Sequence, residues 1–272
     1  MIRPFVLSVL FSGSLLALLG CCSLEDGLLY HPVRSEKKPL PAESAFQDIE
    51  FRTPDGAIVH ARWCPRAGSK GALLYCHGNA GNLESRGRQV WELRETLDES
   101  ILIFDYPGFG RSEGHPSEAG CYAAADAAYD WLVQSQGLAP ENLLLYGESL
   151  GGGVAVELAS RRPHRALILV RTFTSIPDVA QDHLGWLPVR CLISNRFDNL
   201  AKIPLCKQPT FIAQADADHL VPFAHGQRLL KASGPNATLF TLPGSGHNDP
   251  LSSEFYSALR RFLAPPEHRG QG

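Results

Sequence analysis

The sequence predicts a single α/β domain in which helices cover both faces of a mostly parallel sheet. Short apolar runs alternate with segments of helical periodicity along most of the chain, and strands that are apolar throughout are typical of a sheet buried on both sides. Hydrophobic residues make up 44% of the 272 residues and charged residues 19%, which is enough apolar material for one large core. This composition excludes a chain that is disordered over most of its length.

The first two predicted strands form an antiparallel hairpin at one edge of the sheet. Residues 46–53 and 57–64 alternate in polarity and are joined by the turn sequence Pro-Asp-Gly. The later strands are predicted at residues 72–76, 101–105, 143–146, 166–170, 210–214 and 238–242. Helices are predicted at 84–97, 118–134, from about 150, and at 225–231 and 253–263. Ligands bind at the carboxyl ends of the strands in such sheets, so the residues after each apolar run are the candidates for a site.

A Gly-x-Ser-x-Gly pattern, Gly147 to Gly151, follows the strand at 143–146. In a chain with 25 glycines the pattern alone is a weak signal, because a serine in a glycine-rich turn is usually only part of the turn. Here a strand precedes it and a helix follows, which is the context of a nucleophile elbow that lifts the serine hydroxyl clear of the sheet. We therefore predict Ser149 as a nucleophile, with the backbone N–H of Leu150 facing an oxyanion at the start of the helix.

A serine hydroxyl is a poor nucleophile near neutral pH and needs a base, with a further group that orients the base. Asp216 and Asp218 follow the strand at 210–214, and His247 follows the strand at 238–242. The chain therefore offers a serine, an aspartate and a histidine in that order, all at the same edge of the predicted sheet.

Three further motifs lie at the ends of predicted strands: HGNAGN (77–82), DYPGFGRSEG (105–114) and DADHLVP (216–222). With the elbow and His247, they resemble the α/β-hydrolase superfamily over roughly residues 46–263. Within it, the chain is similar to the small serine hydrolases of the bud-emergence type and the protein-depalmitoylating α/β-hydrolase-domain group. The resemblance implies an α/β-hydrolase fold with a short lid and no cofactor or metal. It also implies Asp218, four residues before Pro222, as the acid in place of Asp216, and the backbone N–H of Asn79 as the second oxyanion donor.

Several polar residues in these stretches are expected to have structural roles. Asp105, Arg111 and Ser112 shape a tight loop, and His77 holds the oxyanion loop through hydrogen bonds. Relatives commonly carry an acidic or amide residue where this chain has Arg171. We expect this departure to change the charge at the pocket rim without touching the catalytic residues.

The predicted reaction is hydrolysis of a carboxylic ester or thioester through an acyl-enzyme intermediate. Residues 171–208 leave room for only a short lid, which contains the apolar side chains Phe173, Trp186, Leu187, Ile193 and Phe197. A small apolar lid favours a substrate with a hydrophobic acyl group. Hydrolysis of amides or small peptides remains an alternative, as does a catalytically idle, membrane-tethered binding protein on the same fold, since function depends on the site and not on the fold.

The N-terminus predicts a membrane attachment. Arg3 precedes the apolar residues 5–19, and the following LLGCCS resembles the lipobox at which bacterial lipoproteins are cleaved and acylated on the first cysteine, Cys21. We expect a signal peptide at 1–20, a tether at 21–45, the domain at 46–264 and a tail at 265–272. Within the tether, the apolar residues 28–30 are expected to pack back onto the domain. An uncleaved anchor or an ordinary signal peptide is the alternative. No aspartate follows Cys21, which favours the outer membrane of a bacterial envelope.

Charge and cysteine spacing exclude other functions. The formal net charge is −3 with scattered basic residues, so nucleic acid is not an expected partner, and the sequence does not indicate an oligomeric state. The cysteines form no C-x-x-C pair, so metal or dithiol chemistry has no support. Cys191 and Cys206 could form a disulfide outside the cytoplasm. Cys76 lies within an apolar run and is expected to be a small buried side chain.

Overall fold

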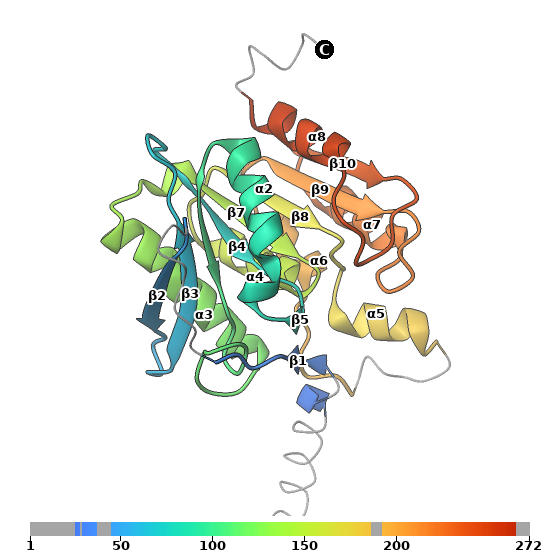
Figure 1. Ribbon diagram of the computed structural model, residues 1–272. Coiled ribbons are helices and arrows are strands. Elements are labelled where there is room, and N and C mark those ends of the chain that lie inside the picture. The colour runs from blue at the N-terminus through green and yellow to red at the C-terminus, as the bar shows by residue number, and fades with distance from the viewer. Residues whose placement is uncertain (1–24, 28, 37–44, 186–191, 265–272) are drawn as a thin grey trace, which may run out of the picture.

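The computed structural model describes residues 25–27, 29–36, 45–185 and 192–264. Its centre is an eight-stranded sheet with the order β10-β9-β8-β7-β4-β6-β3-β2 (Figure 1). Neighbouring strands from β10 to β6 pair in parallel, whereas β3 is antiparallel to both β6 and β2. The mostly parallel sheet with an edge hairpin is therefore confirmed. The strands are β2 (Gln47–Arg52), β3 (Ile58–Cys64), β4 (Ala72–Cys76), β6 (Ser100–Phe104), β7 (Leu143–Glu148), β8 (Ala166–Val170), β9 (Thr210–Ala215) and β10 (Ala237–Leu242).

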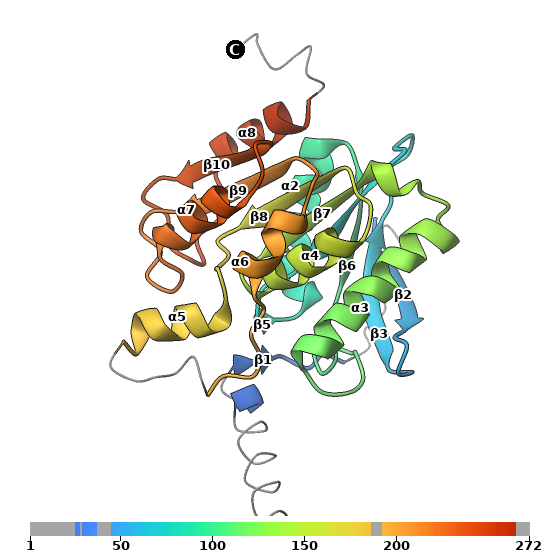
Figure 2. The same ribbon diagram turned by 180° about the vertical axis from the view of Figure 1, so that it is seen from behind.

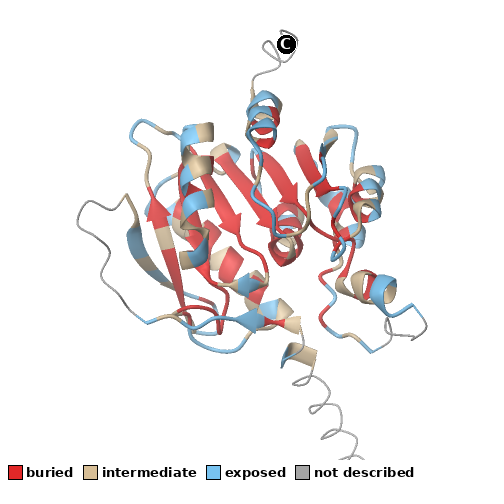
Figure 3. Ribbon diagram, turned by 45° about the vertical axis from the view of Figure 1, so that its right-hand side comes forward, coloured by how far each residue is buried: buried red, intermediate tan, exposed pale blue. Residues whose placement is uncertain are grey.

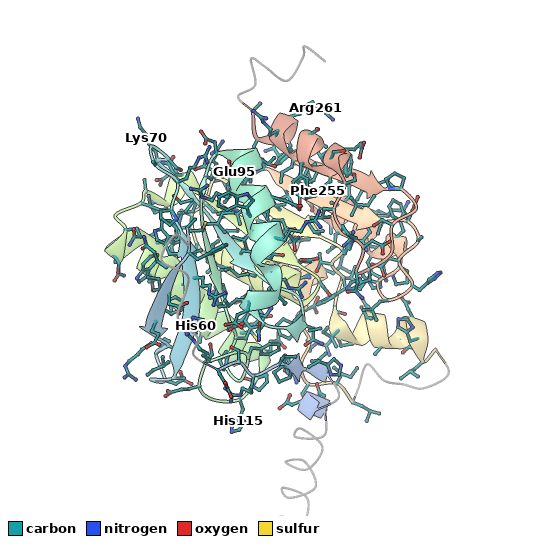
Figure 4. The ribbon with its side chains drawn as sticks, in the orientation of Figure 1. His60, Lys70, Glu95, His115, Phe255 and Arg261 are labelled. Atoms are coloured by element: carbon teal, nitrogen blue, oxygen red, sulfur yellow. The ribbon has the colours of Figure 1, made fainter. Side chains whose placement is uncertain are left out.

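Helices cover both faces of the sheet, as the apolar strands require. Helices α2 (Gly87–Leu97) and α8 (Ser253–Leu263) pack on one face, in front in Figure 1. Helices α3 (Glu118–Asp130), α4 (Leu150–Arg161) and α7 (Phe223–Ala232) pack on the other, in front in Figure 2. The central strands are buried throughout, whereas the helices expose their outer sides (Figure 3). Phe255, labelled in Figure 4, is one of the α8 side chains in the hydrophobic core between this helix and the sheet.

Shorter helices complete the chain. They are α5 (Ile176–His183), α6 (Asn199–Lys202), the 3₁₀ turns Leu83–Arg86, Pro140–Asn142 and Ile203–Leu205, and a π-helical turn, Trp131–Ser135, that continues α3. None of the helices within the described ranges has both the length and the apolar character needed to cross a bilayer.

Glycines allow the turn from β7 into α4 to pack against the neighbouring strand. A Cβ on Gly151 would lie 2.0 Å from the carbonyl oxygen of Cys76 at the end of β4, and a Cβ on Gly147 would lie 2.4 Å from the carbonyl oxygen of Gly151. Both contacts are with main-chain atoms, which cannot turn away as a flexible side chain would. Only glycine therefore fits at these two positions.

Part of the segment expected to be a tether is fixed to the domain. Within it, β1 (His31–Pro32) pairs in parallel with β5 (Ala80–Gly81), and the preceding Tyr30 is only 3% exposed. Residues 29–36 therefore belong to the folded body, which begins before the expected boundary at residue 46. The segment has no apolar periodicity because main-chain hydrogen bonds, and not a hydrophobic face, hold most of it in place.

Two of the apolar side chains between β8 and β9 do not form the expected lid surface. Phe173 and Phe197 are buried in the core, where Phe197 lies against Gly153 of α4. Trp186 and Leu187 lie outside the described residues. The prediction that the two phenylalanines line a lid was wrong, because hydrophobicity alone does not distinguish a lid from a core.

Replacing Gly151 with alanine should lower the free energy of unfolding by at least about 2 kcal/mol, since the added methyl group meets main-chain atoms. Gly87→Ala is the matched control: it starts α2 and has no atom within 4 Å of its Cβ position, so alanine should be neutral or stabilising there. Chemical denaturation followed by circular dichroism measures both variants. Equal stability of Gly151→Ala and the wild type would contradict the close packing of this turn.

Candidate active site

Ser149 lies at the tip of the turn between β7 and α4, in a conformation that non-glycine residues rarely adopt. Its φ is 52° and its ψ is −117°. The backbone is held on both sides, because its N–H donates to the carbonyl of Val170 (3.0 Å) and its carbonyl accepts from the hydroxyl of Thr172 (2.8 Å). This strained geometry is typical of a nucleophile elbow, in which the surrounding structure forces the hydroxyl outward.

The structure brings Ser149, His247 and Asp218 into one hydrogen-bonded chain. The Oγ of Ser149 lies 2.9 Å from Nε2 of His247, and Nδ1 of the same ring lies 2.7 Å from Oδ2 of Asp218. A carboxylate only accepts, so Nδ1 carries the proton and Nε2 is free to accept from the serine hydroxyl. The three residues come from the loops after β7, β9 and β10. Asp216, the alternative acid, is exposed and instead accepts from the N–H of Gly244.

The carboxyl group of Asp218 is held in its ionised form. Burial raises its pKa, but the hydrogen bonds from His247 and from the N–H groups of Val221 and Leu220 outweigh that effect and leave the pKa below its ordinary value. The side chain is buried and its two oxygens are divided between these partners. Asp218 is thus both charged and fixed in orientation beside the imidazole ring.

The two expected oxyanion donors flank the serine. Leu150 is the first residue of α4, where N–H groups have no partner within the helix. On the other side, Gly78 packs against the serine, since a Cβ on Gly78 would lie 3.5 Å from Cβ of Ser149. Asn79 follows directly. Among the described residues, no acceptor is found for the N–H of either Asn79 or Leu150.

A buried polar cluster supports the loop that carries Asn79. Nε2 of His77 lies 3.3 Å from Oδ1 of Asp105, whose same oxygen accepts from the N–H of Leu83. Burial raises the pKa of Asp105, but hydrogen bonds from His60 and His77 lower it overall. The hydroxyl of Tyr106 donates to the carbonyl of His77 at 2.7 Å. The expected structural roles of His77 and Asp105 agree with these contacts.

The other two residues of the same stretch also make supporting contacts. Arg111 forms an ion pair with Asp48 of β2, and the hydroxyl of Ser112 accepts from the N–H of His60. Neither side chain reaches the serine, which agrees with their expected part in shaping the loop.

The N-terminal segment supports the same loop from outside. The apolar residues 28–30 predict packing against the domain, but they do not predict this contact with the loop. The amide of Asn79 donates to the carbonyl of Leu29 (2.5 Å) and accepts from the N–H of His31 (3.3 Å). Asn82 donates in the same way to the carbonyl of Val33 (3.0 Å). The two asparagines in HGNAGN were the available signal, because amide side chains can pair with a main chain on both its donors and its acceptors.

Arg171 contacts the histidine loop directly, contrary to the expectation that it would leave the catalytic residues untouched. It is 2% exposed, and its guanidinium donates to the carbonyl of His247 (3.1 Å) and to the hydroxyl of Ser245 (3.0 Å). Its backbone has a φ of 49°, and its N–H donates to Ala213 of β9. The first residue after β8 therefore fixes the loop after β10.

A polar cavity of about 230 Å³ lies beside the site. Its lining includes Glu148 and Asn248, the chain neighbours of Ser149 and His247, together with Arg86, Gln89 and Arg171. Glu148 accepts a hydrogen bond from the buried hydroxyl of Tyr75 (2.7 Å). Mixed charges and amides suit a polar part of a substrate and not a hydrocarbon chain.

Other expectations concern residues away from this centre. No cluster of potential metal ligands occurs in the part of the chain that the structure describes. Cys76 and Cys206 are buried free thiols, and Cys191 lies outside the described residues. Cys21 also lies outside them.

Comparisons with known proteins agree with this architecture. A family model described as the alpha/beta hydrolase fold matches residues 71–190. The uncharacterized protein MT2364 of Mycobacterium tuberculosis is 36% identical over 245 residues, which cover 88% of this chain and 86% of that protein. Alpha/beta hydrolase domain-containing protein 17B of Xenopus laevis is 32% identical over 231 residues, or 82% of this chain and 76% of that protein.

Among solved structures, the esterase Pf2001 of Pyrococcus furiosus has a similar fold. It aligns with a TM-score of 0.70 at 19% identity, over 86% of this chain and 98% of that chain. At this level of identity the likeness concerns the fold alone. With the sequence relatives above, it leads to one conclusion: the chain belongs to the α/β-hydrolase family.

Proposed function

We propose that this protein is a serine hydrolase that cleaves carboxylic esters or thioesters by transferring their acyl group to water. The observation that carries the proposal is the hydrogen-bonded chain from Ser149 through His247 to Asp218, with distances of 2.9 and 2.7 Å. A serine in a strained turn, with a neutral ring nitrogen within hydrogen-bond distance, meets the requirements of an activated nucleophile. The esterase among the structures of similar fold is compatible with this chemistry.

In the first step, Ser149 Oγ attacks the carbonyl carbon while Nε2 of His247 takes its proton. The carbonyl oxygen becomes an oxyanion, which the N–H groups of Asn79 and Leu150 stabilise. The ionised Asp218 holds the proton on Nδ1 and stabilises the imidazolium that forms. Because all these groups are fixed before substrate binds, little reorganisation is needed as charge develops.

Collapse of the oxyanion expels the alkoxide or thiolate, which receives the proton from Nε2 of His247. The acyl group is then bound to Ser149 as an ester. A water molecule, deprotonated by the same nitrogen, attacks this ester and releases the carboxylic acid and the free serine. No metal or redox group takes part in this sequence of steps.

We further propose a substrate with a hydrophobic acyl group and a polar leaving group, such as an acylated protein or lipid. The polar cavity beside Glu148 and Asn248 suits the leaving group. The apolar segment 5–19 and the lipobox-like LLGCCS support lipid attachment at Cys21 in a bacterial envelope, with the outer membrane favoured. The hydrophobic acyl group is supported by the resemblance of the sequence motifs to the protein-depalmitoylating hydrolases.

A fluorophosphonate probe tests the proposed nucleophile. The wild-type protein should be labelled, and Ser149→Ala should lose the label together with nearly all ester hydrolysis, because the proposed acyl-enzyme forms on the Ser149 hydroxyl. Ser160→Ala is the matched control, since its hydroxyl lies at the far end of α4, where it donates to the carbonyl of Glu157. Absence of label on the wild type would favour an idle binding protein, and equal labelling of Ser149→Ala would contradict Ser149 as the nucleophile.

Arg171 should act by positioning the histidine loop and not by binding substrate. Arg171→Met removes both hydrogen bonds to that loop and should lower kcat roughly 10- to 100-fold with little change in KM. Arg171→Lys, which can still donate one hydrogen bond, should retain more of the rate. Steady-state kinetics on a p-nitrophenyl ester separate the two parameters, and a rise in KM at unchanged kcat would instead place Arg171 in the substrate site.

A further inference from the structure

Four exposed aliphatic side chains lie at the carboxyl edge of the sheet, on the segments that form or flank the site. They are Val33, Leu184, Leu192 and Leu220, with exposed fractions of 53%, 43%, 74% and 49%. We call these four side chains the apolar rim. Single exposed leucines are common on protein surfaces, but a group of them around a catalytic centre calls for an explanation.

Hydrogen bonds connect three members of the rim to the catalytic loops. The N–H of Leu220 donates to the carboxylate of Asp218, and its carbonyl lies 2.9 Å from Nε2 of His183 at the end of α5. Leu184 follows His183 directly. On the other side of the site, the N–H of Val33 donates to the carbonyl of Gly81 (3.2 Å), in β5 of the oxyanion loop.

The fourth member, Leu192, lies just before two residues that contact Glu25, where the described chain begins. The carboxylate of Glu25 accepts from the N–H groups of Ser194 (3.0 Å) and Asn195 (2.7 Å), two and three residues after Leu192. Tyr30 adds a buried hydrogen bond to the side chain of Asn195 (2.8 Å). The N-terminal segment is therefore attached to the rim on one side and to the oxyanion loop on the other.

The course of the chain places this edge close to the membrane attachment. Glu25 follows Cys21 by four residues, which span at most about 14 Å when fully extended. If the apolar segment 5–19 remains as an anchor instead, its end is six residues from Glu25, or about 21 Å at most. Figure 1 shows β1, β5 and α5 at the bottom of the molecule and the C-terminal end at the top. In Figure 4, His115 marks the lower edge, and Lys70 and Arg261 mark the upper edge.

We propose that the apolar rim rests on the bilayer to which the N-terminus is attached, so that the acyl chain of the substrate reaches Ser149 directly from the membrane. This inference rests on the proposed hydrolase function and deepens it, because it identifies the substrate as an acyl ester or thioester embedded in a bilayer. The cavity beside the serine is polar and suits the head group, while the acyl chain stays in the lipid. The bilayer is the favoured occupant because the described chain begins beside the rim at Glu25, only four residues after the predicted acylation site Cys21.

The chain offers a matched control for this surface. Leu205 is 57% exposed, but it lies in the 3₁₀ turn that leads to the start of β9, at the opposite ends of the strands from Ser149. A glutamate at position 205 should therefore remain in water when the rim rests on the membrane. Leu184→Glu/Leu192→Glu and Leu205→Glu all place charge on exposed side chains, but on opposite edges of the sheet.

The experiment uses the full chain, with its N-terminus intact, in vesicles of phosphatidylethanolamine and phosphatidylglycerol. Two rates are measured, on water-soluble p-nitrophenyl acetate and on 4-methylumbelliferyl palmitate incorporated in the vesicles. Leu184→Glu/Leu192→Glu should lower the second rate on the order of tenfold, because two carboxylates weaken contact with the lipid, and leave the first rate unchanged. Leu205→Glu should change neither rate. Equal loss on both substrates would place the rim in the catalytic site itself, and no loss on either would also overturn the proposal.

A second measurement does not depend on hydrolysis. Vesicles that contain a phospholipid with a diazirine on its acyl chain should, after illumination, crosslink to peptides that carry Leu184, Leu192 or Leu220 and not to the peptide that carries Leu205. Crosslinking only at Leu205, or at none of these peptides, would overturn the proposed orientation. A wild type that crosslinks as expected but hydrolyses neither ester would instead contradict the proposed function alone.

Discussion

The backbone of Ser149, forced into a left-handed conformation between three strand ends, is the constraint on which the site depends. Its N–H is bound to Val170 at the end of β8, and the adjoining Gly151 lies against the carbonyl of Cys76 at the end of β4. The strain at one residue is sustained because these contacts come from strands buried on both faces. The direction of the hydroxyl is therefore determined by contacts with the strand ends and not by the loop alone.

The loops that meet at this hydroxyl are fixed by polar contacts of different origin. Asp218 orients the histidine ring, Arg171 holds the main chain of the same loop, and Asp105 supports the oxyanion loop from below. The N-terminal segment holds that loop from the outside through Asn79. The proposed attachment to a membrane and the support of the oxyanion loop thus involve the same N-terminal part of the chain.

Much of the fold and the centre of the site could be predicted from the sequence, because buried parallel strands are marked by apolar runs and their carboxyl ends meet at one edge. This logic identified Ser149, an aspartate and His247 as residues that should lie together, and the resemblance to the α/β-hydrolases favoured Asp218 over Asp216. It missed the role of Arg171, since the approach of its side chain to the loop after β10 depends on packing beyond the strand order. It also placed Phe197 in a lid, because the hydrophobicity of a side chain does not indicate whether it packs in the core or in a lid.

The most direct test is to identify the residue that carries the acyl group during turnover. A rapidly quenched mixture with a p-nitrophenyl ester, digested and analysed by mass spectrometry, should show the acyl group on the peptide that contains Ser149. His247→Ala should form far less of this adduct, because the hydroxyl then lacks its base. An acyl group on another residue of an active protein, or its absence from Ser149 under conditions of burst kinetics, would contradict the account.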